Sequence, residues 1–157
     1  MAKQEDRTSV VTGLVRAAFL VDAVYAASAR DHGLTPQQGQ LLCVLLPQAH
    51  GMSDLVAMLG LAKSSLTGLV DRSERNGYVR RAPDPYDTRA VRVSLTEAGR
   101  RLADEFYRDT CRRVGELTAG LDAPDTAALA RLLDRVVIDN EVPEVFMDPG
   151  DAPPGRD

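Results

Sequence analysis

The 157-residue sequence has little of what catalysis, metal binding or a cofactor requires. It holds two cysteines and two histidines, and their spacing matches no zinc site. It contains no glycine-rich phosphate loop, no Gly-x-Ser-x-Gly nucleophile turn and no His-Glu-x-x-His pair. Its Asp, Glu and Ser residues form no paired arrangement along the chain. We therefore expect no enzyme, no cofactor and no metal site.

A secretion or membrane signal is also missing from the sequence pattern. Residues 1–7 are mostly charged or polar and lead into a helical pattern, rather than into an uninterrupted apolar stretch with a cleavage site. We therefore expect a cytoplasmic protein without a membrane partner.

Positive charge is scarce overall but concentrated in one segment. The formal net charge is −4, which argues against a protein that coats nucleic acid indiscriminately. Residues 61–101 nevertheless carry nine Lys and Arg against five Asp and Glu, while the rest of the chain carries ten against 18. This excess suits a local phosphate footprint on an acidic body. The alternative is an ordinary charged surface in contact with solvent.

Two helices are predicted in the first third of the chain. Apolar residues at helical spacing run from Thr8 to Asp31, and His32-Gly33 then ends the helix. Thr35-Pro36 begins a mostly apolar helix that we expect to extend to about His50. Both histidines would then lie at helix ends, where a cation interacts favourably with the helix dipole. The alternative for His32 is a role in a ligand pocket or in pH sensing.

A helix-turn-helix is predicted next. Ser53 is expected to cap a short helix, and Gly60-Leu61 to make the turn into a helix that starts near Ala62. In this second helix Leu66, Leu69 and Val70 mark the inner face. The outer face carries small polar side chains, which can approach base edges closely.

A β-hairpin is predicted after the turn at Asn76-Gly77. Residues 78–81 and 90–94 are β-prone and flank the loop 83–89, which contains two prolines and two aspartates. We expect this loop to hold a defined shape and to project Arg89. Helix, turn and hairpin together indicate a winged helix, so the expected fold class is mainly α with a small α+β winged helix-turn-helix lobe.

The C-terminal part is predicted to be helical. Thr96-Glu97 begins a long helix whose apolar residues continue to Leu121. Asp122-Ala123-Pro124 interrupts the pattern and begins a last amphipathic helix. Residues 148–157, with three prolines and two glycines, are predicted to be a flexible tail.

Four short motifs occur in the order and spacing of one bacterial protein family. They are Leu69-Val70-Asp71-Arg72, Pro83-Asp84-Pro85, Asp87-Thr88-Arg89 and Ser94-Leu95-Thr96-Glu97-Ala98-Gly99. Over about residues 53 to 101 the chain resembles the MarR family of transcription regulators, and elsewhere it is similar in helix pattern and length. The resemblance implies a sequence-specific DNA-binding regulator, in most cases a repressor.

The resemblance also implies roles for single residues. The wing arginine, Arg89 here, enters the minor groove, and Asp87 orients it or a neighbouring arginine. Gly68 stands where many relatives carry a long basic side chain, so we expect Arg89 and minor-groove width to contribute more to specificity. The expected DNA contacts on the recognition helix are Lys63, Ser64, Ser65, Thr67, Gly68 and Arg72. Those on the wing are Arg80, Arg81, Asp87, Thr88 and Arg89.

Two positions depart from the family pattern. Ala62 replaces the usual capping serine, which predicts the loss of about 1 kcal/mol of cap energy. Ser73 occupies a position often held by leucine. It predicts either spare room beside a cavity or an unmet hydrogen bond, the alternative being ordinary packing variation.

The terminal helices carry more apolar surface than a winged helix of about 70 residues needs. The resemblance implies dimerisation helices in residues 1–34 and 96–147, around a DNA-binding lobe of residues 35–95. A two-fold homodimer would place two recognition helices about 34 Å apart on a near-palindromic operator. The alternative is that these helices extend a monomeric core.

A small-molecule effector is the expected regulator, phenolic or carboxylic in chemistry as in relatives. The helix faces suggest a pocket lined by Arg16, Phe19, Tyr25, His32 and Phe106.

Two alternatives keep the same fold. One is an oxidant sensor that acts through Cys111, with its thiolate stabilised by Arg112 and Arg113. Cys43 is expected to be buried and inert. The other is a winged helix that serves as a protein-binding scaffold.

Overall fold

The computed structural model describes residues 9–143 and 145, and the predicted tail of residues 148–157 lies outside them. The helices are α1 (Val10–Asp31), α2 (Pro36–Leu45), α3 (Met52–Leu59), α4 (Lys63–Arg75), α5 (Glu97–Glu116) and α6 (Ala123–Asp139). The strands β1 (His50–Gly51), β2 (Val79–Pro83) and β3 (Val91–Leu95) form one antiparallel sheet in the order β1-β3-β2. The predicted, mainly helical winged helix-turn-helix is confirmed.

Local signals explain most helix boundaries. Thr35 and Gln38 form a capping box, in which each side chain accepts a hydrogen bond from the other's backbone N–H at 3.1 and 3.0 Å. Thr96 and Asp122 cap α5 and α6 through side-chain oxygens that accept hydrogen bonds from the backbone N–H groups of Gly99 and Asp125. Ala62 precedes α4 without a side-chain cap bond, as the sequence predicts.

The second helix is shorter than predicted. It ends at Leu45, because Pro47 has no backbone N–H and cannot donate the hydrogen bond that would continue the helix. The expected helix-end role of His50 is therefore wrong. This residue pairs with Val93 in a short strand that the sequence analysis did not predict.

Two further boundaries differ from the prediction. Gly51, not Ser53, is the N-cap of α3, because the chain turns into the helix directly from the extended strand β1. The long C-terminal helix ends at Glu116, and Leu121 lies in the turn that follows.

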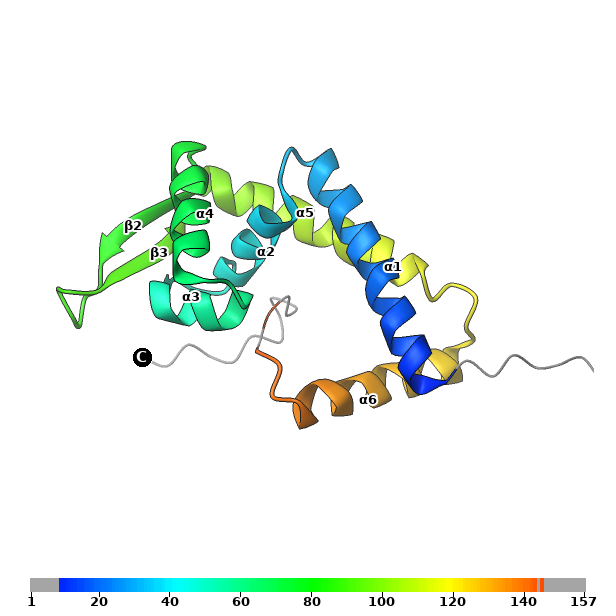
Figure 1. Ribbon diagram of the computed structural model, residues 1–157. Coiled ribbons are helices and arrows are strands. Elements are labelled where there is room, and N and C mark those ends of the chain that lie inside the picture. The colour runs from blue at the N-terminus through cyan, green and yellow to red at the C-terminus, as the bar shows by residue number, and fades with distance from the viewer. Residues whose placement is uncertain (1–8, 144, 146–157) are drawn as a thin grey trace, which may run out of the picture.

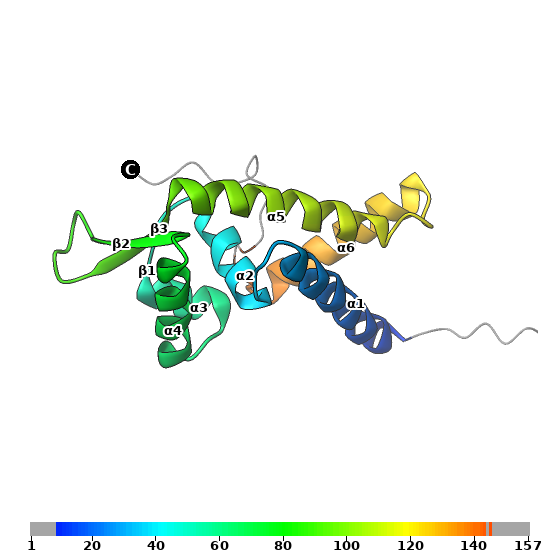
Figure 2. The same ribbon diagram turned by 90° about the horizontal axis from the view of Figure 1, so that it is seen from above.

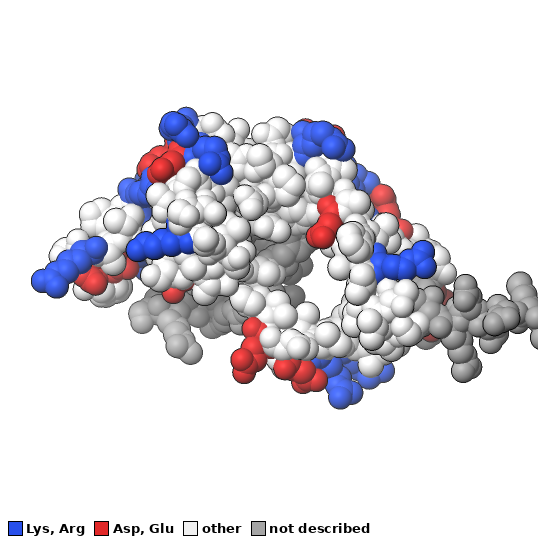
Figure 3. All heavy atoms as spheres, in the orientation of Figure 1, with Lys and Arg blue, Asp and Glu red and all other residues white. Residues whose placement is uncertain are grey.

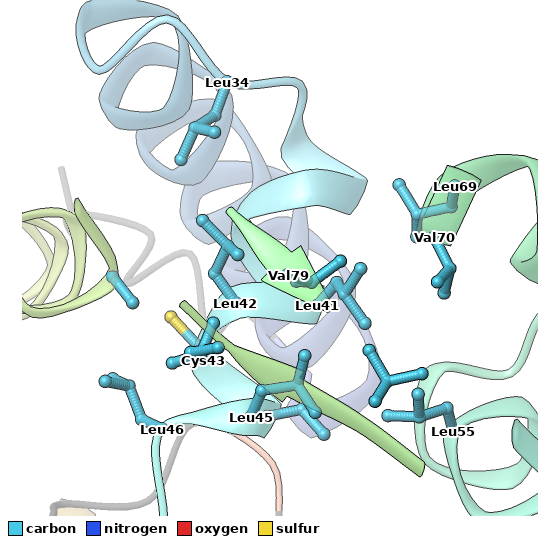
Figure 4. Packing of buried hydrophobic residues seen from close by; sticks show 14 of the residues in the cluster. Leu34, Leu41, Leu42, Cys43, Leu45, Leu46, Leu55, Leu69, Val70 and Val79 are labelled. Atoms are coloured by element: carbon cyan, nitrogen blue, oxygen red, sulfur yellow. The ribbon is translucent and has the colours of Figure 1, made fainter. Parts of the chain in front are cut away.

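The core lies between the recognition helix, the sheet and α2. Leu41, Leu42 and Leu45 of α2 are fully buried, and Figure 4 shows them in one cluster with Val79 of the sheet. Leu66, Leu69 and Val70 of α4 are also fully buried. Ser73 on the same face is 0% exposed and its hydroxyl has no hydrogen-bond partner within the described part of the chain. Of the two outcomes predicted for Ser73, the structure therefore has the unmet hydrogen bond.

Two helices extend away from the lobe that this core holds together. In Figures 1 and 2, α5 runs from the sheet to the opposite end of the molecule, where it crosses α1 and leads to α6. Buried Ser28 and Thr110 share a hydrogen bond of 2.7 Å at the crossing. The helix α6 has no buried residue. Helix α1 is long and apolar enough to cross a membrane, by length and composition alone.

Candidate nucleic-acid interface

The exposed face of α4 carries the side chains predicted to contact DNA. Since Leu66, Leu69 and Val70 hold one face of the helix on the core, the opposite face is left to solvent. Thr67 donates its hydroxyl hydrogen to the Lys63 carbonyl at 2.9 Å, so its oxygen can only accept further bonds. The exposed residues of this face are Lys63, Ser64, Ser65, Thr67 and Arg72.

Gly68 leaves space for an arginine on the same face. A Cβ atom at Gly68 would lie 3.2 Å from Nη1 of Arg72. The Arg72 guanidinium therefore lies beside the backbone of Gly68, one helical turn before its own Cα. It places a positive charge near the position where the family pattern has a long basic side chain.

The wing loop is held by its own hydrogen bonds. The Asp84 carboxylate accepts from the backbone N–H groups of Tyr86 and Asp87 at 2.8 and 3.2 Å, and the Asp87 carboxylate accepts from the N–H of Arg89 at 3.0 Å. Ala90 closes the loop through two backbone bonds, to Asp84 and Asp87. The predicted defined shape is confirmed.

Arg89 is presented by this loop with its side chain exposed. Asp87 bonds to its backbone N–H, so the aspartate orients the arginine through the main chain. Among residues 9–143 and 145, the Arg89 guanidinium has neither an ion pair nor a hydrogen bond. Thr88 is exposed beside it.

The two arginines of β2 differ in their surroundings. Arg80 is exposed and donates a bond of 3.3 Å from Nε to the Ser94 hydroxyl. Arg81 is only 27% exposed and bridges two carboxylates of α4, from Nη2 to Asp71 Oδ1 and from Nη1 to Glu74 Oε2, both at 2.6 Å. Its N–H also donates to Glu74 at 3.1 Å. Arg81 therefore joins the wing to the recognition helix, a role that the sequence analysis missed.

The wing is fixed to α5 by a close backbone contact. A Cβ atom at Gly99 would lie 1.8 Å from the carbonyl oxygen of Tyr78, so only glycine fits. The N–H of Thr96 donates to that same oxygen at 3.0 Å, and its hydroxyl donates to the Gly77 carbonyl at 2.6 Å. The start of α5 thus holds the start of β2.

Charge is distributed unevenly over the surface. Figure 3 shows Lys and Arg side chains along the edge formed by the wing and α4, whereas much of α1 is uncharged on this face. Arg92 is less available, because it donates to the Ala49 carbonyl and lies 3.8 Å from Asp84. The basic segment 61–101 is therefore partly used for internal contacts.

Three of the five predicted pocket residues come together. The Phe106 ring is 0% exposed and makes edge contacts with the rings of Tyr25 and His32, whose centroids lie 5.2 and 5.8 Å away. Arg16 and Phe19 lie nearer the start of α1, and Phe19 is 72% exposed. In the described part of the chain, the ring contacts therefore join only Tyr25, His32 and Phe106 of the predicted set.

A cavity of about 170 Å³ lies beside Tyr25, between α1, α2 and α3. The helix faces of α1 and α5 did not indicate the residues that α2 and α3 contribute to this cavity. The sequence feature that could have indicated α3 as part of the cavity is its apolar end, formed by Met58 and Leu59. The cavity is lined by Tyr25, Gln40, Cys43, Val44, Met58, Leu59 and Val145.

The cysteines do not favour oxidant sensing. Cys43 is buried, and burial raises the pKa of its thiol to about 12, which agrees with the expected inert residue. Arg112 pairs with Asp109 and Glu116, and Arg113 pairs with Asp109 and Asp31. The two arginines expected to stabilise a Cys111 thiolate are thus neutralised by carboxylates.

Known proteins match this arrangement. Residues 32–90 match the family model described as MarR family. The chain is 33% identical over 141 residues to the HTH-type transcriptional repressor NicR of Pseudomonas putida, with 87% of each chain covered.

Solved structures agree with the sequence matches. Apo wild-type MarR of E. coli is 25% identical with a TM-score of 0.74, covering 82% of this chain and 96% of that one. Bordetella bronchiseptica BpsR, whose DNA binding is regulated by 6-hydroxynicotinic acid, is 26% identical with a TM-score of 0.69, covering 86% and 97%. Members of this family are transcription regulators, not enzymes. With its recognition helix, wing and helix order in agreement with these relatives, the chain belongs to the MarR family of DNA-binding transcription regulators.

Proposed function

We propose that the protein is a cytoplasmic, homodimeric repressor that binds a near-palindromic operator and releases it when a small molecule occupies the cavity beside Tyr25. The observation that carries this proposal is the exposed polar face of α4 next to a self-bonded loop that presents an unpaired Arg89. Lys63, Arg72 and Arg80 would contact phosphates, which position the protein without reading sequence. Ser64, Ser65 and Thr67 would contact base edges.

Dimerisation is supported by apolar side chains that remain exposed among residues 9–143 and 145. Phe19 of α1 is 72% exposed and Ile138 of α6 is 64% exposed. Burying one such side chain contributes about 1.5–3 kcal/mol, so a partner that covers several of them would bind tightly. We propose that residues 1–34 and 96–147 form the dimer and that residues 35–95 form the DNA-binding lobe. The exposed apolar residues include Val10, Val11, Leu14, Val15, Leu20, Leu132, Leu133 and Val137.

Release by an effector is supported by the position of the cavity. Tyr25 lies on α1, one of the proposed dimerisation helices, and Met58 lies on the first helix of the helix-turn-helix. A molecule bound between them contacts both parts. It weakens DNA binding if it favours a spacing of the two lobes that the operator does not.

Selection of fragments from random DNA at a stated salt concentration tests the proposal. We expect a near-palindromic sequence with fixed half-site spacing, and a mass in light scattering of twice the 17.0 kDa chain. Leu133→Asp should give monomers with weakened DNA binding, whereas the neighbouring exposed Asp134→Ala should not. A monomeric wild type that retards no DNA would contradict the proposal and favour a protein-binding scaffold.

A further inference from the structure

The loop at the tip of the wing, residues 83–89, presents a tyrosine as well as an arginine. Tyr86 is 87% exposed, whereas Tyr25, Tyr78 and Tyr107 pack against the core. In Figures 1 and 2 the loop between β2 and β3 forms one end of the described structure, away from α1, α5 and α6. The Tyr86 ring is therefore accessible to a partner that approaches the wing.

We infer that Tyr86 is a further DNA-contacting residue. Its ring lies against the sugars at the edge of the minor groove, and its hydroxyl donates a hydrogen bond to a backbone phosphate. This inference rests on the proposed function, because it needs the wing to be seated on DNA. It adds a neutral contact beside the charged contact expected of Arg89.

The loop holds the backbones of Tyr86 and Arg89 in the same way. The Asp84 carboxylate accepts a hydrogen bond from the N–H of Tyr86 at 2.8 Å, and the Asp87 carboxylate accepts one from the N–H of Arg89 at 3.0 Å. In each case an aspartate fixes the residue two positions later. The backbone of the tyrosine is therefore set before DNA binds, as is that of the arginine.

A tyrosine at this place offers contact area at a small entropic cost. Its side chain supplies a large surface while only two torsions must be fixed on binding. Among residues 9–143 and 145, the Tyr86 hydroxyl makes no hydrogen bond. One donor is therefore left for a partner, and a phosphate oxygen is an acceptor that tyrosine hydroxyls use on DNA.

The width of the minor groove assigns the ring to its edge. The groove is about 6 Å wide, which suits one arginine side chain but not an arginine with a ring beside it. Tyr86 stands three positions before Arg89 on a loop closed by the backbone bonds of Ala90. With the arginine in the groove, the tyrosine meets the sugars and phosphates that form the groove wall.

Two substitutions separate the hydroxyl from the ring. Binding is measured by fluorescence anisotropy on labelled operator and on operators with base pairs exchanged beneath the wing. Tyr86→Phe removes only the hydroxyl and should weaken binding about three- to tenfold. The factor should be the same for all these duplexes, since a phosphate contact carries no sequence information. Tyr86→Ala also removes the ring and should bind about twofold more weakly again, or less tightly still.

The salt dependence separates a direct contact from damage to the wing. Tyrosine contributes no charge, so both variants should keep the wild-type slope of log K against log salt. Arg89→Ala should instead lower that slope by about 0.9. If Tyr86 only shaped the loop, its replacement would displace Arg89 and lower the slope as well.

A tryptophan in the loop reports its burial directly, because the chain contains no tryptophan of its own. Acrylamide quenching of the indole in Tyr86→Trp should fall about twofold when operator is added, since a DNA interface excludes solvent from the surface that it buries. The matched control is Gln37→Trp, at an exposed position in the first turn of α2 outside the interface described above. Its quenching should not change.

Four results would each overturn the inference. They are wild-type affinity in Tyr86→Phe, a loss confined to one operator sequence, a lowered salt slope in the tyrosine variants, and equal quenching changes in the two tryptophan variants. A wild type that retards no DNA contradicts the proposed function itself. A wild type that binds its operator no better than the Tyr86 variants contradicts only the role of this residue.

Discussion

Arg81 provides a direct test of how the wing and the recognition helix are coupled. Its guanidinium reaches both Asp71 and Glu74 at 2.6 Å while its backbone N–H donates to Glu74. Replacing Arg81 by alanine removes both ion pairs and leaves the carboxylates of Asp71 and Glu74 on α4 without this cation. We expect this variant to bind its operator about three- to tenfold more weakly than the wild type.

The stability cost follows from the geometry. Two short charge-assisted bonds are stronger than an ordinary surface pair, but the partners are partly exposed and screened by solvent. We therefore expect a loss of about 1–2 kcal/mol in the free energy of unfolding. For a chain of about 150 residues each kcal/mol lowers the melting temperature by about 2–4 °C. Arg81→Lys keeps one charge but cannot span both carboxylates, so it should fall between wild type and alanine.

The salt dependence of operator binding distinguishes positioning from direct contact. A residue that neutralises a phosphate contributes about 0.9 to the slope of log K against log salt. Arg80→Ala, on the exposed side of the same strand, should lower that slope by about this amount. Arg81→Ala should leave the slope unchanged. A decrease of about one unit in Arg81→Ala would show that this residue contacts DNA directly, and the coupling role would be wrong.

Three other predictions follow from single contacts. Arg89→Ala should weaken operator binding by about 1–3 kcal/mol and lower the salt slope by about one in anisotropy titrations, and an unchanged isotherm would remove the wing from the interface. Gly99→Ala, whose Cβ would overlap the Tyr78 carbonyl, should cost about 3 kcal/mol or more in urea unfolding, and a normal midpoint would refute the close contact. Because burial raises the pKa of Cys43 from 9.0 to about 12, the folded protein holds this proton longer than the unfolded chain. Its contribution to stability is therefore full below pH 9 and lost between pH 9 and 12, so the wild type should lose more stability than Cys43→Ala over that range; parallel pH profiles would contradict it.

The sequence supports the fold prediction well where local chemistry sets the structure. The helix start at Thr35-Pro36, the turn at Gly77 and the loop with two prolines around Asp84 are set by a few neighbouring residues, and the structure has each as expected. The dipole argument for His50 failed because its conformation depends on pairing with β3, more than 40 residues away. A strand of two residues is too short to show a β pattern in the local sequence, so its pairing with a distant strand could not be predicted.

The sequence predicted that the candidate contact residues lie on α4 and the wing, but it did not predict the contacts that they make with one another. Residue type and spacing place Arg80 and Arg81 on one strand, yet only the packing of β2 beside α4 directs Arg81 to Asp71 and Glu74. The cavity beside Tyr25 depends likewise on helices that meet across the chain. Patterns along one helix identify its buried face, but they do not reveal which other helix covers it.

Helix α5 is one uninterrupted helix that connects the DNA-binding lobe to the region proposed to dimerise. Its first turn is fixed to Tyr78 through Gly99, and its last turns carry Arg113, which is tied to the end of α1. Twenty residues of helix measure about 30 Å. If the helix moves as a rigid body, a tilt of roughly 5° about one end displaces the other end by about 2.6 Å. A tilt this small therefore moves the recognition helix by most of the distance of about 3.4 Å that separates neighbouring bases along a DNA strand.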